Sequence, residues 1–76
     1  MNPNQANVLI HVDEPLEIEQ LSALQGALGA IEGVSAVQPS SHRDLMRVSY
    51  DPLATRTQVI VIQVRKQGLH AQAIGL

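Results

Sequence analysis

The length, composition and charge of this chain exclude several classes of protein. The chain has 76 residues, with five basic and seven acidic residues, no cysteine and a single aromatic residue, Tyr50. One small domain is therefore expected, and disulfides, thiol catalysis and thiolate metal sites are excluded. Nucleic-acid binding is not expected, because that function needs clustered basic residues and aromatic side chains on which bases can stack.

Neither a membrane span nor a signal peptide is predicted. The longest apolar run, Val59–Ile62, is far too short to cross a bilayer. The polar stretch Met1–Gln5 lacks the basic region and apolar core of a secretory signal. We therefore expect a cytoplasmic protein with no membrane insertion, in which residues 1–6 form a disordered tail and residues 7–76 form the domain.

The first part of the domain has the pattern of a strand followed by a helix. Apolar residues alternate from Val8 to Val12, which is the period of a strand. From Glu17 the period changes to that of an amphipathic helix, which Gly33 is expected to end. The apolar stripe of this helix consists of Leu21, Leu24, Leu28 and Ile31.

Two further strands are predicted in the middle of the chain. Val34–Val37 is the shorter one, and Leu45–Tyr50 follows after a cluster of turn residues. The turn Asp51-Pro52 is expected to end the second of them.

The segment Val59–Val64 is ambiguous. Its β-branched residues are typical of a strand. A capping-box spacing at Thr55 and Gln58 and a stop at Gly68 favour a helix over residues 55–67, which is the interpretation we adopt. The alternating residues 69–74 then form a final strand.

The resulting order is strand, helix, strand, strand, helix, strand. It predicts an α+β fold, a ferredoxin-like βαββαβ sandwich. Its four-stranded antiparallel sheet would have the order 4-1-3-2, with both helices on one face.

Three short motifs resemble the heavy-metal-associated domain family. These are Ile31–Val37, with its Gly-Val entry to a strand, the Tyr-Asp-Pro turn of Val48–Pro52, and the strand entry Gly68–Ala71. They occur in the family's order and spacing, and the match covers about residues 7–74. The resemblance implies the ferredoxin-like fold and the context of copper chaperones and heavy-metal-pumping ATPases.

The family's two metal-binding cysteines are missing. Counting back from Gly33 places their positions at Glu17 and Gln20. Carboxylate and amide oxygens are hard donors, whereas Cu(I) selects soft sulfur, so the family's thiolate copper transfer is not implied here. No catalytic or nucleotide-binding motif is visible either. We therefore expect a non-enzymatic binding domain without a cofactor, acting through protein contacts in a metal-handling or transport context.

An alternative hypothesis is a carrier or sensor of divalent zinc or copper. If Val12 lies opposite Leu69, as the family's geometry implies, then His11 lies opposite His70 on the outer sheet face, where two imidazoles could share one ion. The three histidines of the chain, His11, His42 and His70, could equally be ordinary residues of a polar surface. The candidate ligands are His11, His70, His42 and Glu17.

The second helix is apolar nearly all round. Ile60, Val61 and Val64 can face the sheet, whereas Val59 and Ile62 cannot both do so. An adjoining outward pair favours a contact surface for a protein partner or a weak homodimer, although simple excess hydrophobicity would give the same pattern. The open sheet face could add Leu9, Val37 and Ile74.

Overall fold

The computed structural model describes residues 5–74. Residues 1–4 of the expected tail lie outside this range. The first strand begins at Ala6, which was expected to belong to the tail. The side-chain nitrogen of Gln5 also lies 3.3 Å from the hydroxyl of Ser35.

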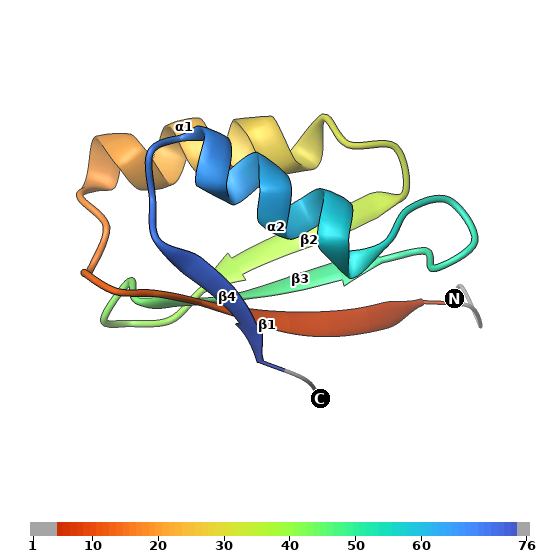
Figure 1. Ribbon diagram of the computed structural model, residues 1–76, viewed down its shortest axis with the longest axis horizontal. Helices are drawn as coiled ribbons and strands as arrows, with labels where there is room; N and C mark the ends of the chain where they lie inside the picture. Colours follow the sequence, from red (N-terminus) through yellow and green to blue (C-terminus); the bar gives the residue numbers. More distant parts are fainter. Residues whose placement is uncertain (1–4, 75–76) are drawn as a thin grey trace.

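The predicted fold is confirmed. The elements follow the order strand, helix, strand, strand, helix, strand, and the sheet has the order β2-β3-β1-β4 with every neighbouring pair antiparallel. This is the predicted order read from the other edge. Both helices cover the same face of the sheet (Figure 1). The elements are β1 Ala6–Val12, α1 Ile18–Gly29, β2 Val34–Pro39, β3 Leu45–Tyr50, α2 Thr57–Lys66 and β4 Ala71–Ile74.

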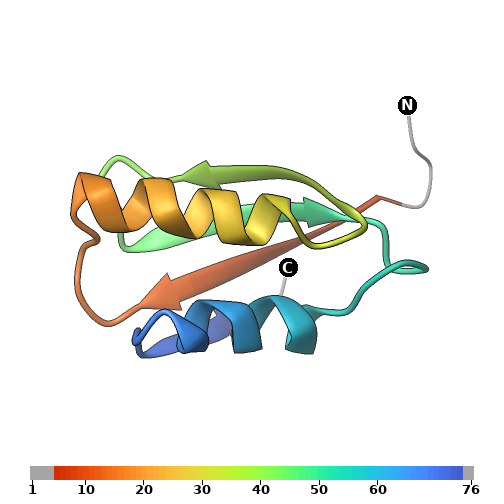
Figure 2. The same ribbon diagram turned by 90° about the horizontal axis from the view of Figure 1, so that it is seen from above.

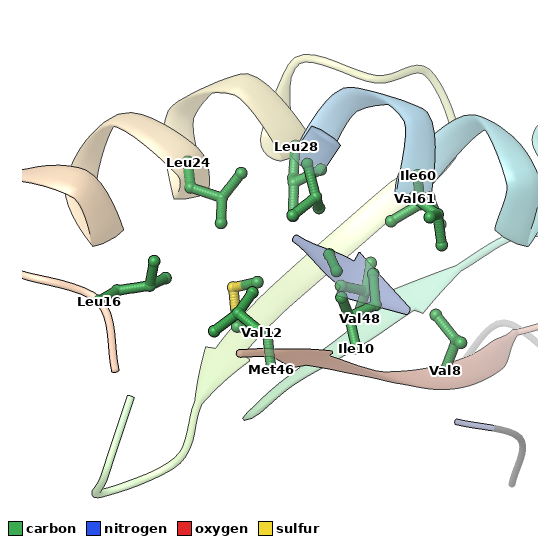
Figure 3. Close-up of a cluster of buried hydrophobic side chains, with 12 residues drawn as sticks. Val8, Ile10, Val12, Leu16, Leu24, Leu28, Met46, Val48, Ile60 and Val61 are labelled. Atoms are coloured by element: carbon green, nitrogen blue, oxygen red, sulfur yellow. The ribbon is translucent and has the colours of Figure 1, made fainter. Parts of the chain in front are cut away.

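The core lies between the helices and the sheet (Figure 3). The predicted alternation of β1 is confirmed, because Val8, Ile10 and Val12 are all buried against the helices. Leu24 and Leu28 of α1 are fully buried as well. Each such side chain stabilises the fold by about 1.5–3 kcal/mol relative to an exposed position.

Helix α1 is shorter than predicted. It ends at Gly29, and Ile31 still packs against the core from the turn that follows. Gly33 has a φ of +96° and lies in the turn into β2, and a Cβ atom there would come within 2.7 Å of the Cβ of Ala54. Gly33 therefore serves the close approach of two turns and not the helix end itself.

The prediction that Val59–Val64 is helical is confirmed. Helix α2 is preceded by the N-cap residue Arg56, without a side-chain cap, so the predicted capping box of Thr55 and Gln58 does not form. Thr55 is buried instead. Gly68 follows the helix with a φ of +84°, as a glycine stop requires. Burial of one face of α2 on the sheet outweighs the strand preference of its β-branched residues.

Candidate functional site

The start of α1 carries Glu17 and Gln20, the two residues predicted from the sequence motifs to stand at cysteine positions of heavy-metal-associated domains. Glu17 is the N-cap residue of α1, and its backbone N–H donates to the side-chain oxygen Oε1 of Gln20 at 3.0 Å. This is one half of a capping box, in which the glutamine satisfies a helix-start donor. Sequence analysis placed a capping box on the wrong helix and missed this one. The side-chain oxygen of Gln20 thus already accepts a hydrogen bond from the start of the helix.

An aliphatic side chain anchors the loop between β1 and α1. Leu16 is 1% exposed, and its N–H donates to the backbone oxygen of Arg43 in the β2–β3 turn at 2.9 Å. The surface where the loop meets α1 is acidic, because the N-cap residue Glu17 and Glu19 in the first turn of the helix are both exposed. Ile18 between them is 71% exposed, a feature that sequence analysis did not single out. The loop offers only oxygen donors, on a surface that is open to solvent.

The predicted pairing of His11 with His70 is wrong. Strand β4 pairs with β1 so that His11 lies opposite Gln72, and Val12 lies opposite Ala71. The backbone oxygen of His70 accepts a hydrogen bond from Asp13 at 3.1 Å, so His70 precedes the strand. The register thus differs by two residues from the predicted one. A two-residue shift leaves every side chain on its own face, so the alternation of the sequence could not reveal it.

The remaining candidate ligands do not gather around one point. His11 is half-buried, and its Nδ1 atom is buried without a hydrogen-bond partner in the described part of the chain. His42 is exposed in the β2–β3 turn, and Glu17 is exposed at the start of α1. Among residues 5–74, no three histidine, aspartate or glutamate side chains are placed to hold a metal ion together.

The predicted division of α2 into two faces is confirmed. Ile60, Val61 and Val64 are buried on the sheet, whereas Val59 is 41% and Ile62 is 49% exposed. The two exposed side chains therefore form an aliphatic pair on the outer surface of the helix.

The apolar residues found on the open face of the sheet agree only in part with the prediction. Leu9 and Ile74 are opposite each other on this face. Val37, by contrast, lies opposite the buried Val48 and packs against the core. A bulge between Val34 and Ala36 shifts the alternation of β2 by one residue, which turns Val37 inward.

A groove beside the exposed pair was missed by sequence analysis. It has a volume of about 440 Å³ and lies between α2 and the edge strand β4. Arg65 stands in it, and its Nε atom donates to the backbone oxygen of Ala71 at 3.2 Å. The sequence does indicate that this part of the chain is basic, since residues 52–76 contain Arg56, Arg65 and Lys66 but no acidic residue. The groove is lined by Thr57, Gln58, Val61, Ile62, Arg65, Gln72 and Ala73.

Within residues 5–74, no helix has the length and apolar character needed to cross a membrane.

Comparison with known proteins establishes the fold. No family model matches the sequence, and no curated protein matches it. Solved structures do match. The N-terminal domain of a potential copper-translocating P-type ATPase from Bacillus subtilis is 17% identical with a TM-score of 0.84, covering 93% of this chain and 89% of that one. A putative copper-ion-binding protein from Bacillus anthracis is 17% identical with a TM-score of 0.83, covering 93% of this chain and 100% of that one.

A third match is oxidized MerP from Ralstonia metallidurans. It is 18% identical with a TM-score of 0.77, and the alignment covers 91% of this chain and 96% of that one. The chain therefore has the fold of heavy-metal-associated domains, and its sequence contains no cysteine.

Proposed function

We propose that this chain is a non-enzymatic binding domain of the heavy-metal-associated type, which has no thiolate metal site and acts through protein contacts in a metal-handling or transport context. The context is suggested by the similar structures, which are named as copper-binding or copper-translocating proteins. The chain itself cannot offer Cu(I) the soft ligands that this ion selects, because it has no cysteine.

The observation that carries the proposal is the aliphatic pair on the outer surface of α2. Val59 and Ile62 are exposed although the same helix already buries a complete face on the sheet. Burial of each in an interface would contribute about 1.5–3 kcal/mol. This gain must exceed association costs of at least about 4 kcal/mol, so the contact surface has to extend beyond the pair. The neighbouring groove provides that extension.

The metal-carrier alternative rests on fewer observations. Its premise was a direct apposition of His11 and His70, and the register places Gln72 opposite His11. Among residues 5–74, no three of the candidate ligands come together, whereas zinc sites in proteins use three or four protein ligands.

Metal titration is the decisive experiment. Calorimetric titration of the wild-type chain with Zn²⁺ and with Cu²⁺ should show no saturable site of one ion per chain. The matched variants are His11→Ala and His42→Ala, which remove a half-buried and an exposed imidazole. A stoichiometric site in the wild type that only His11→Ala removes would replace our proposal with the metal-carrier function.

A further inference from the structure

Strand β4 is a free edge of the sheet. Within residues 5–74 it pairs with β1 alone, since the order of the strands is β2-β3-β1-β4. Asp13 donates to the backbone oxygen of His70 at 3.1 Å, so by antiparallel alternation Gln72 and Ile74 also direct their backbone groups toward β1. The backbone N–H and C=O groups of residues 71 and 73 therefore point outward, away from the sheet.

One of these outward groups is already occupied. The backbone oxygen of Ala71 accepts the bond from Arg65 Nε at 3.2 Å, which is how a charged side chain protects a sheet edge. Within residues 5–74, no hydrogen bond uses the outward N–H or C=O of Ala73. The second half of β4 thus offers a donor and an acceptor to an incoming strand.

Helix α2 covers the space into which such a strand would fit. Figure 2 shows α2 lying over β4 along the outer border of the sheet. Its residues Gln58, Val61, Ile62 and Arg65 follow the spacing i, i+3, i+4, i+7, so they share one side of the helix and together line the groove above the free edge. An added strand would lie under this stripe, with alternate side chains against Ile62.

The charge of this region indicates the chemistry of the strand. Of the residues that line the groove, Arg65 alone is charged, and it has donors beyond its Nε atom. A second copy of this chain that paired through the same groove would bring another Arg65 to the interface, and like charges in an interface are unfavourable. An acidic segment would pair with Arg65 instead.

We propose that the groove between α2 and β4 binds an extended acidic segment of a partner protein, which adds to β4 as a fifth strand. Backbone bonds to Ala73 supply the pairing, contact with Ile62 holds an apolar side chain, and a carboxylate of the segment meets Arg65. This inference rests on the proposed function and specifies its partner. It favours a heterologous partner over the homodimer.

Selection from a library of random peptides tests the proposal without a known partner. Phage displaying peptides of about ten residues are panned against the immobilised wild-type chain. The recovered sequences should alternate β-branched or aliphatic residues with Asp or Glu. On binding, the backbone amide of Ala73 should become protected from hydrogen exchange, while the exchange of the Glu17 amide should not change.

Three variants separate this mode from adventitious binding. Ala73→Pro removes the outward N–H and leaves the backbone bonds of Gln72 and Ile74 to β1 intact, so it should weaken a recovered peptide by about tenfold or more. Arg65→Gln should weaken it similarly and reduce its dependence on salt. Lys66→Gln, which makes the same charge change outside the groove, should alter the affinity less than about twofold.

Three outcomes would overturn the inference. They are recovered peptides without acidic residues, unchanged binding to the Ala73→Pro variant, or exchange protection confined to other strands. Unfolding of a proline variant is checked by its backbone chemical shifts, and protection of Ala73 in the wild type does not depend on any variant. None of these outcomes depends on whether the chain binds a metal ion. The metal titration therefore tests the proposed function separately.

Discussion

The side-chain oxygen of Gln20 accepts a hydrogen bond from the backbone nitrogen of Glu17 at 3.0 Å. Gln20, which the sequence motifs predict at a cysteine position of heavy-metal-associated domains, therefore stabilises the start of α1. The preceding loop is held by Leu16, which is buried and whose N–H donates to the backbone oxygen of Arg43.

Removal of this cap should destabilise the domain. We expect Gln20→Ala to lower the free energy of unfolding by about 0.5–1 kcal/mol, since it leaves a helix-start donor without its partner. Urea denaturation measures the change. Gln58→Ala is the matched control, because Gln58 lies in the first turn of α2 and no side-chain cap forms there. Equal losses in the two variants would show that the Glu17–Gln20 bond contributes nothing.

The wild-type chain should not retain Cu(I) against a competing chelator. It has no thiolate, and Glu17 and Gln20 occupy the positions predicted for the family's cysteines. The double variant Glu17→Cys and Gln20→Cys should gain one Cu(I) per chain, because both positions are exposed at the start of α1. Either single cysteine variant should bind much more weakly. Retention of Cu(I) by the wild type would contradict the prediction and reveal ligands elsewhere.

The two isoleucines of α2 should respond differently to replacement by glutamate, because one is exposed and the other is buried. Ile62 is 49% exposed, so Ile62→Glu should leave the fold intact and suppress binding at the outer surface of α2. Ile60 is fully buried, so Ile60→Glu should unfold the domain or cost more than about 4 kcal/mol. Circular dichroism and sedimentation at several concentrations measure both effects. If Ile62→Glu unfolded the domain, Ile62 would belong to the core and the contact surface would be lost.

Two glycines should respond with opposite signs to the addition of one methyl group. Gly33→Ala should destabilise the domain by about 1–3 kcal/mol, because φ is +96° and the new Cβ would lie 2.7 Å from that of Ala54. Gly26→Ala should stabilise it by about 0.5–1 kcal/mol, because Gly26 is inside α1 and nothing lies within 4 Å of the added atom.

A second substitution separates the two causes at Gly33. In the double variant Gly33→Ala with Ala54→Gly the steric contact is absent, so only the cost of the left-handed backbone conformation should remain. Thermal unfolding of the wild type, the Gly33→Ala and Ala54→Gly single variants and the double variant measures the difference. A Gly33→Ala variant as stable as the wild type would show that the two turns can separate at no cost.

Much of the fold could be predicted because its signals are local. The alternation from Val8 to Val12 fixes the inner face of β1, and the spacing of Leu24 and Leu28 fixes the inner side of α1. The division of α2 into buried Ile60 and exposed Ile62 follows in the same way from the helical period. These faces depend only on which residues are apolar and how far apart they are.

The candidate site depends on relations that have no such local signal. The sequence pattern is identical for registers that differ by two residues, so only the packing of β4 against β1 decides that Gln72 and not His70 faces His11. The bulge in β2 that turns Val37 inward arises from pairing with β3. The groove at the β4 edge likewise arises from tertiary packing, because it is formed where α2 lies beside β4 and Arg65 of the helix donates to the backbone oxygen of Ala71. The sequence alone determined the elements and their inner faces, because local periodicity encodes them. Tertiary structure decided which side chains meet, because register and edge geometry are set by long-range pairing.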